Sequence, residues 1–182
     1  MKILIVSGFL GAGKTTFIKR LARNVDQRFA ILENEYGAAG IDGARLGQNR
    51  QGTQKNVWEM TEQCICCIGK KDFAASVLTI ANVVDPEYLI VEPTGVGSLA
   101  RIIENLRQIE YERIQLLSPV TIVDVYSYRR YMAEYPELYQ DQIRSADTII
   151  VSKTEACQAE EKQRIQKFLQ EINPQAKIIQ SS

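Results

Sequence analysis

The feature that most constrains the fold of this chain is a glycine-rich segment between a short apolar run and a helical pattern. The segment Gly8-Phe9-Leu10-Gly11-Ala12-Gly13-Lys14-Thr15 matches G-x-x-x-x-G-K-S/T. Ile3-Leu4-Ile5-Val6 precedes it, and a helical pattern over residues 14–24 follows. In this context the segment is a phosphate-binding loop, because its backbone N–H groups converge on an anion at a helix N-terminus. The chain is therefore expected to bind a nucleoside triphosphate.

The loop residues have distinct expected roles. Lys14 would reach the β- and γ-phosphates and act in catalysis, and the Thr15 hydroxyl would bind Mg²⁺ directly. The alternative is a glycine-rich turn that binds nothing, and the agreement of motif and context weighs against it. The nucleotide contacts expected from this segment are Gly8, Gly11, Ala12, Gly13, Lys14, Thr15 and Thr16.

Short β-branched runs alternate with longer helical patterns along the whole chain. Several runs, such as Leu89-Ile90-Val91 and Ile149-Ile150-Val151, are continuously apolar, as expected for parallel strands covered on both faces. The alternation predicts an α/β fold: a doubly wound, mainly parallel sheet of about seven strands with helices on both faces. The predicted strands cover residues 2–7, 29–33, 57–60, 88–92, 119–124, 147–152 and 176–180, and the predicted helices 14–24, 71–84, 98–106, 136–144 and 159–172.

The composition narrows the partners and the compartment. The 182 residues fit one domain, 1–182, which can bury roughly two-thirds of its unfolded surface. The 22 basic and 22 acidic residues cancel, which argues against nucleic acid or an anionic membrane as the main partner. No apolar run approaches the ~20 residues of a membrane helix. The absence of a targeting segment favours the cytoplasm.

Two strand ends carry further candidate residues. Glu92 ends an apolar strand and is followed by Pro93, Thr94 and Gly95. Ligands gather at the carboxyl ends of parallel strands, so Glu92 is expected to hold Mg²⁺ or to act in catalysis, and Gly95 to let its backbone approach the γ-phosphate. A helix-entry turn is the alternative. Asp124 ends the next strand and either supports this site or caps a turn.

Ser152-Lys153-Thr154-Glu155 follows the predicted strand 147–152 and resembles the N/T/S-K-x-D sequence with which GTPases read guanine. We expect nucleotide contacts from Ser152, Lys153 and Glu155. The carboxylate would accept hydrogen bonds from the base, and the lysine stem would pack along it. Glu155 is one methylene longer than the usual aspartate, which makes selectivity over adenine less secure. A solvated turn is the alternative.

The most distinctive local feature is Cys64-Ile65-Cys66-Cys67. Three thiolates on one turn suit Zn²⁺ or a similar metal, and buried inert cysteines are the alternative. The chain has no histidine, so any other ligand is a carboxylate or water. The glycine-rich stretch Gly37–Gly52 is expected to be a functional loop, as its length is unusual for a compact domain.

Together these motifs resemble the CobW-like GTPases, relatives of UreG and HypB. The phosphate loop, Glu33-Asn34-Glu35-Tyr36-Gly37, Cys64–Cys67, Glu92–Gly95 and Ser152–Glu155 occur in the order and spacing of that family, over essentially the whole chain. The resemblance implies a GTP-hydrolysing metallochaperone, or a helper that loads or reactivates a metal cofactor. It makes Glu33–Gly37 a switch segment and Cys64–Cys67 the metal site, with Glu35 as an additional ligand.

The chain also departs from the family pattern. Gln63 stands where a glycine commonly precedes the first cysteine, and Ala38 where an acidic residue often follows the switch segment. Histidine ligands of some members are missing. The family's usual C-terminal domain is absent as well, so the chain is expected to be an isolated nucleotide-binding domain.

The favoured hypothesis is a Mg²⁺-dependent GTPase whose GTP and GDP states are coupled to metal binding or delivery. Its target would be an unidentified metalloprotein or a cofactor-dependent protein. No arginine finger is assignable, so a partner or a nucleotide-dependent homodimer would complete the site. One alternative is an ATP-dependent small-molecule or protein kinase, which would clamp phosphate with Arg45, Arg50, Arg129 or Arg130. The other is a non-hydrolysing module that recruits partners according to the bound nucleotide.

Overall fold

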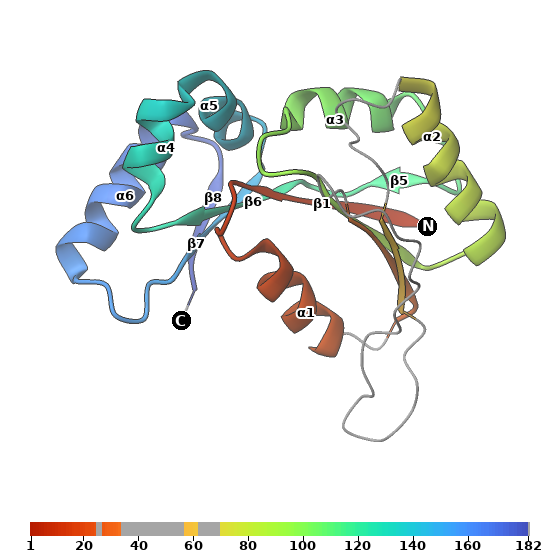
Figure 1. The fold of residues 1–182 in the computed structure, drawn as a ribbon, viewed down its shortest axis with the longest axis horizontal. Helices are drawn as coiled ribbons and strands as arrows, with labels where there is room; N and C mark the ends of the chain where they lie inside the picture. The colour runs from red at the N-terminus through yellow and green to blue at the C-terminus, as the bar shows by residue number, and fades with distance from the viewer. Residues whose placement is uncertain (25–26, 34–56, 62–69, 182) are drawn as a thin grey trace.

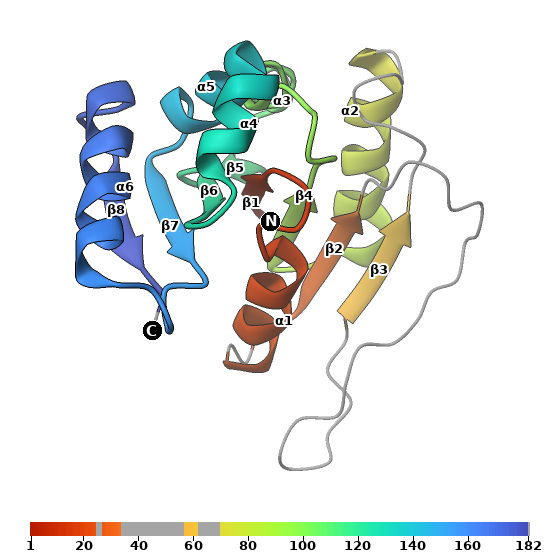
Figure 2. The same cartoon turned by 60° about the vertical axis from the view of Figure 1, so that its left-hand side comes forward.

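The computed structural model describes residues 1–24, 27–33, 57–61 and 70–181. They form an eight-stranded sheet in the order β3-β2-β4-β1-β6-β7-β8, with β5 paired to β1 (Figures 1 and 2). Each registered pair of neighbouring strands is parallel. The strands are β1 (Lys2–Gly8), β2 (Phe29–Glu33), β3 (Val57–Thr61), β4 (Tyr88–Glu92), β5 (Gln115–Leu116), β6 (Val120–Asp124), β7 (Thr148–Ser152) and β8 (Lys177–Gln180).

The helices cover both faces of the sheet, as predicted. In Figures 1 and 2, α1 lies on one side of the sheet and α2, α3, α4 and α5 on the other. The helices are α1 (Lys14–Asn24), α2 (Lys70–Thr79), α3 (Leu99–Arg107), α4 (Tyr128–Glu134), α5 (Pro136–Arg144) and α6 (Ala159–Ile172), and a π-helical turn, η1 (Ile80–Val84), extends α2. None of the helices in these described ranges is long and apolar enough to cross a membrane.

Successive residues of the central strands face two different apolar cores, one on each side of the sheet. In β1, Ile3 and Ile5 face the core shared with α2, α3, α5 and α6, whereas Val6 faces the core under α1. Helix α1 contributes Ile18 and Ala22 to that second core, four residues apart on one face. Because side chains alternate across a strand, both faces of the central strands must be apolar. This explains the continuous hydrophobic runs in the sequence.

The topology places the end of β1 at the centre of the molecule. Strand β1 lies between β4 on one side and β6 on the other. Strands β2, β3 and β4 lie on one side of β1, and β6, β7 and β8 lie on the other. Such a switch point leaves a crevice at the carboxyl ends of the strands. The phosphate loop follows β1 at this point.

Most predicted boundaries agree with the structure, and the differences have local causes. The predicted helix 71–84 is regular to Thr79 and then widens into η1, which Asp85 ends in a left-handed conformation with φ 46°. Helix α4 and the two-residue β5 were not predicted. Helix α4 has only seven residues, and it is separated from α5 by Tyr135, whose φ of −137° and ψ of 56° are not helical, in keeping with the restriction that Pro136 places on the residue before it.

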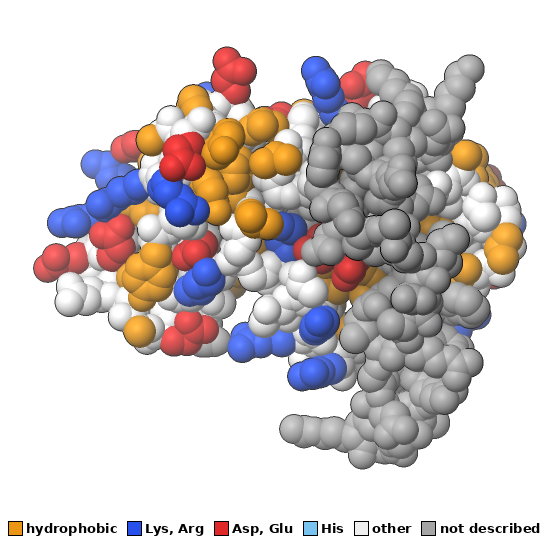
Figure 3. Space-filling view, in the orientation of Figure 1, with side chains coloured by type: hydrophobic (Ala, Val, Ile, Leu, Met, Phe, Trp, Pro, Cys, Tyr) orange, Lys and Arg blue, Asp and Glu red, His pale blue; other side chains and the backbone are white. Residues whose placement is uncertain are grey.

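The surface has the mixed charge that the composition predicts. Across the part of the face over α4 and α6, basic and acidic side chains are interspersed (Figure 3). Arg129 and Arg164 both pair with Glu161 there.

Candidate functional site

The phosphate loop has the backbone that its glycines predict. Gly8, Gly11 and Gly13 have φ values of 144°, 74° and 101°, all in the region that favours glycine. At Gly8 a side chain is excluded by space as well, since a Cβ would lie 2.5 Å from the carbonyl oxygen of Ile122. The Ala12 N–H donates to the Phe9 carbonyl at 3.1 Å, which closes the loop before α1 begins.

Lys14 is buried at the centre of this loop. The residue is only 8% exposed. The ammonium nitrogen donates to the carbonyl oxygens of Gly8 at 2.9 Å and Phe9 at 3.5 Å. A buried cation held by carbonyl dipoles is suited to binding a polyphosphate, which supplies the opposite charge.

The next residue joins the loop to β4. The Thr15 hydroxyl donates to the Glu92 carboxylate, with distances of 3.1 Å to Oε1 and 3.4 Å to Oε2. Glu33 ends β2 directly beside Glu92 in the sheet register. A hydroxyl and two carboxylates at neighbouring strand ends are hard oxygen donors, so the residues present fit Mg²⁺.

These groups line one pocket of about 620 Å³. It is open to solvent and large enough for the phosphates and part of a nucleoside. Its lining comes from the phosphate loop and from the ends of β2 and β4: Leu10, Gly11, Gly13, Lys14, Thr15, Thr16, Glu33, Glu92, Pro93, Thr94, Gly95 and Val96.

Gly95 brings the turn after β4 against the phosphate loop. A Cβ at this position would lie 2.7 Å from the Leu10 backbone nitrogen and 3.1 Å from the Phe9 carbonyl carbon. Such distances exclude a side chain unless the backbone shifts. Gly95 therefore approaches the backbone of the loop that would hold the phosphates, and its approach to a γ-phosphate stays a prediction.

The candidate base-reading segment contacts the phosphate loop at Ala12. The Ser152 hydroxyl donates to the Ala12 carbonyl at 2.6 Å. Lys153 has a left-handed backbone, φ 60°, and its ammonium lies 2.7 Å from Asp124 Oδ2. Asp124 Oδ1 accepts the Tyr126 N–H at 2.9 Å, so this carboxylate caps a turn and positions Lys153. Glu155 is exposed.

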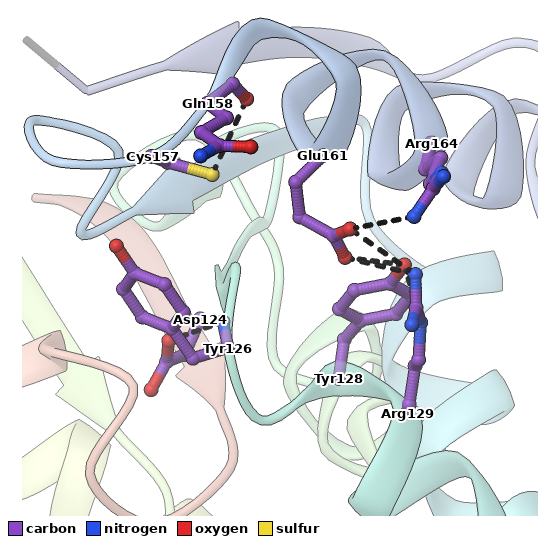
Figure 4. A network of polar contacts seen from close by, with 8 residues as sticks. All are labelled: Asp124, Tyr126, Tyr128, Arg129, Cys157, Gln158, Glu161 and Arg164. Carbon is purple, nitrogen blue, oxygen red and sulfur yellow. Dashed lines mark hydrogen bonds and ion pairs between the residues drawn. The ribbon is translucent and has the colours of Figure 1, made fainter.

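Behind this segment a polar network joins α4 to α6 (Figure 4). The Tyr128 hydroxyl donates to Glu161 at 3.2 Å and accepts from Arg129 Nε at 3.0 Å. Burial raises the pKa of Tyr128, and the hydrogen bond to Tyr128 raises the pKa of Arg129. Both groups therefore keep their ordinary charge at neutral pH, and the network holds the two helices together.

Several contacts around the loop were not anticipated from the sequence. Phe9 packs its ring against Tyr131 at 4.7 Å and Tyr139 at 5.0 Å between centroids, and the Tyr131 hydroxyl donates to the Leu10 carbonyl at 2.9 Å. Gln142 of α5 reaches the turn after β4. The one available signal was a glutamine on the otherwise apolar face of the predicted helix 136–144, between Tyr139 and Ile143.

The predicted metal ligands Cys64, Cys66, Cys67 and Glu35 lie outside the described residues, as do Asn34–Gly37 of the switch segment and Gly37–Gly52. Within the ranges that are described, no group of three or more Cys, Asp or Glu side chains is arranged to hold a metal ion. The thiolate site therefore stays a prediction from the sequence.

Comparison with known protein families decides which group of phosphate-loop proteins this is. The model of the CobW/HypB/UreG nucleotide-binding domain matches residues 2–180. The chain belongs to this family. In this domain the phosphate loop follows β1, the Glu92–Gly95 segment begins at the end of β4, and the Ser152–Glu155 segment begins at the end of β7.

Individual relatives and solved structures agree with this assignment. The zinc chaperone YeiR of Escherichia coli is 31% identical over 97% of the chain and 54% of its own length. The zinc chaperone CobW of Pseudomonas aeruginosa is 27% identical over the whole chain and 56% of its own length. The chain thus spans about half the length of these relatives. The zinc-bound YjiA GTPase of E. coli has the same fold, with a TM-score of 0.72 and 23% identity over 98% of the chain and 56% of YjiA.

Proposed function

We propose that residues 1–182 are the nucleotide-binding domain of a metal chaperone and that this domain binds Mg²⁺–GTP and hydrolyses it. The observation that carries the proposal is the Thr15 hydroxyl bound to the Glu92 carboxylate at 3.1 Å, beside the buried ammonium of Lys14. A hydroxyl, a carboxylate and a lysine in one pocket are the set that phosphate-loop enzymes use for Mg²⁺–triphosphate.

In this proposal each side chain has a defined task. Lys14 moves from the loop carbonyls to the β- and γ-phosphates and balances the charge that develops on them. Thr15 and Glu92 hold Mg²⁺, which neutralises the phosphate oxygens when bound. Glu92 or a residue of the switch segment Glu33–Gly37 orients the attacking water. Because no arginine finger is assigned, we expect slow turnover until a partner or a second copy of the chain completes the site.

The base is proposed to be guanine. Lys153 is fixed by its ion pair with Asp124, so its stem can lie along the plane of a base. Glu155 would accept the ring N–H and the exocyclic amine of guanine, which adenine does not offer in that arrangement. Ser152 ties this segment to Ala12 of the phosphate loop and so sets the distance between base and phosphates.

The nucleotide state is proposed to control a transition metal, with Zn²⁺ as the first candidate. Relatives that match this chain are named zinc chaperones, and one from Dictyostelium discoideum is named zinc-regulated GTPase metalloprotein activator 1. Cys64, Cys66 and Cys67 would hold the metal with Glu35 as a fourth ligand. The metal is cargo for a metalloprotein or for a cofactor-dependent target. Its affinity must differ between the GTP and GDP states for the cycle to deliver it.

A kinase is the less favoured alternative because two of its candidate phosphate clamps have other partners. Arg129 Nη2 pairs with Glu161 Oε1 at 3.0 Å. The Arg130 guanidinium lies 4.7 Å from the centre of the Tyr131 ring. Arg45 and Arg50 lie outside the described residues.

The test is nucleotide selectivity and phosphate release, with and without Zn²⁺, for the wild type and for Cys66→Ser/Cys67→Ser. We expect the wild type to bind GTP more tightly than ATP and to release phosphate from GTP. The double variant should keep nucleotide binding and lose Zn²⁺ binding, since serine is a poor ligand for a borderline-soft ion. Transfer of phosphate from ATP to an acceptor would favour a kinase. GTP binding without phosphate release, with Zn²⁺ and candidate partners present, would favour a recruitment module.

A further inference from the structure

A buried glutamine of α5 holds the turn that follows β4. Gln142 is 1% exposed, and its Nε2 donates to the carbonyl oxygens of Gly95 at 3.1 Å and Gly97 at 3.0 Å. The turn itself is closed by the Gly97 N–H, which donates to the Thr94 carbonyl at 2.9 Å. One side chain therefore fixes the carbonyl groups of two of the four residues in the turn Thr94–Gly97.

The same turn forms a wall of the nucleotide pocket. Thr94, Gly95 and Val96 line the pocket, and Gly95 touches the phosphate-loop backbone at Leu10. The turn begins two residues after Glu92, the carboxylate proposed to hold Mg²⁺. Ligands of a parallel sheet bind at the carboxyl ends of its strands, so in the proposed function this wall would lie beside the terminal phosphate.

Fixing the carbonyls also fixes the N–H groups of the turn. In a trans peptide the C=O and N–H bonds point in opposite directions. When Gln142 draws the Gly95 carbonyl toward α5, the Val96 N–H of the same peptide is directed away from α5. Backbone N–H groups at a turn are the groups that bind phosphate oxygens, so their direction decides whether the turn can contact a phosphate.

Of the two halves of the Gln142 amide, the NH₂ group is the one that makes hydrogen bonds among the described residues. Gln142 Oε1 is buried and has no hydrogen-bond partner among the described residues. A buried unpaired oxygen costs stability, so an apolar side chain would be preferred here if packing alone mattered. The cost is consistent with a residue kept for its two N–H bonds to the turn.

Helix α5 is itself anchored on three sides. The Thr121 hydroxyl of β6 donates to the Gln142 carbonyl at 2.9 Å, and Asp141 Oδ2 accepts the Leu99 N–H at the start of α3 at 2.7 Å. Tyr139 packs against Phe9 of the phosphate loop. The helix thus bridges the loop and the turn, the two walls between which a γ-phosphate would lie.

We propose that Gln142 is a positioning residue that sets the Thr94–Gly97 turn for the terminal phosphate, so that the preference for GTP over GDP depends on its side-chain N–H groups. This inference rests on the proposed function and adds a determinant of nucleotide state to it. Gln142 touches no phosphate itself and acts through the backbone of Gly95 and Gly97.

The experiment compares binding of GDP and of a non-hydrolysable GTP analogue in two variants. Gln142→Met removes both donors at nearly constant volume, and Gln142→Glu replaces them with an acceptor that faces two carbonyls. We expect affinity for the analogue to fall by about tenfold in Gln142→Met and further in Gln142→Glu, with GDP affinity within about threefold of wild type. The kcat for GTP should fall by a similar factor.

The matched control is Asn173, a buried amide at the C-terminal end of α5. Its Nδ2 donates to the Ile143 and Ala146 carbonyls at 2.9 Å each, and none of these three residues lines the pocket. Asn173→Leu and Asn173→Asp should lower the melting temperature and leave the GTP-to-GDP affinity ratio unchanged.

Each other outcome overturns the proposal. An unchanged ratio in the Gln142 variants means that the residue only packs. Loss of folding in both Gln142 variants, with the Asn173 variants folded, assigns it a structural role. If the wild type binds neither nucleotide, the proposed function fails and this inference fails with it, whereas an unchanged ratio leaves the proposed function intact.

Discussion

The two ends of the candidate nucleotide site are built in different ways. At the phosphate end the walls are made of closely packed backbone: Gly8 and Gly95 have no room for a Cβ. At the base end the contacts are made by side chains, and those are half-exposed or exposed. Lys153 has a side chain that is 49% exposed and pairs with Asp124, and Glu155 is exposed.

This difference indicates that the fold determines phosphate binding more tightly than base preference. Backbone geometry in a packed interior is difficult to alter without loss of stability, so the ability to hold a polyphosphate is set by the fold. Exposed side chains change at small cost, and base preference is therefore the property that substitutions can adjust most easily. Four variants test this contrast.

The largest effect is expected for Lys14→Ala. The ammonium is the one positive charge that the loop holds among its own carbonyl groups, at 2.9 Å from the Gly8 oxygen. Removing a charged group of this kind costs about 100-fold to 1,000-fold in phosphate chemistry, and we expect that loss in both GTP affinity and turnover. Calorimetric titration with GTP and a phosphate-release assay measure it. Lys19→Ala, at an exposed position of the same helix, is the control and should change neither.

A smaller effect is expected for Gly95→Ala. The added Cβ would meet the Leu10 nitrogen at 2.7 Å, so the turn and the loop must move apart. Overpacking of this kind lowers stability by about 1–3 kcal/mol. It should weaken the binding of GTP more than that of GDP, because it displaces the wall near the terminal phosphate.

Gly11→Ala separates packing from backbone strain. Gly11 has a φ of 74° but nothing within 4 Å of an added Cβ. A left-handed alanine costs about 1–2 kcal/mol and creates no clash, so it should lower the melting temperature with a smaller change in the GTP-to-GDP ratio. If Gly11→Ala and Gly95→Ala had equal GTP-to-GDP affinity ratios, close packing at Gly95 would not be what forms the wall near the terminal phosphate.

The phosphate end is also the part that the sequence predicts best. The motif Gly8–Thr15 specifies a conformation through residue types with strong backbone preferences, and the adjoining runs specify β1 and α1 through their periodicity. Parallel topology predicts that Glu92 faces the phosphate loop, since strand ends meet at one edge, and the Thr15 hydroxyl of that loop donates to it.

Contacts between distant segments could not be predicted in the same way. Gln142 is the polar residue between Tyr139 and Ile143 on the apolar face of its helix, and nothing in the sequence shows that it is directed to Gly95 rather than to solvent. The ion pair between Asp124 and Lys153 joins two strand ends whose side-chain directions depend on the turns that follow. Each of these contacts depends on the packed positions of two elements, which local preference does not determine.

The smallest effect is expected for Asp124→Asn, at the base end. The amide can still accept the Tyr126 N–H at its Oδ1 position, but it no longer attracts the Lys153 ammonium. Because Lys153 is half-exposed, the lost attraction is weakened by solvent and is of order 0.2–1 kcal/mol. Guanosine nucleotides should bind about two- to fivefold more weakly, since Lys153 would no longer be held along the base.

Two measurements distinguish a role of the Asp124–Lys153 ion pair in base binding from a general effect on stability. They are the salt dependence of GTP affinity and a comparison with Glu161→Gln. Raising the ionic strength should reduce the difference between Asp124→Asn and wild type, because an exposed pair is screened. Glu161→Gln weakens the pair with Arg129 between α4 and α6, away from the base-reading segment, and should leave GTP affinity unchanged. If both variants weakened GTP equally, Asp124 would act through the stability of this half of the sheet. Lys153 would then have no particular role in binding the base.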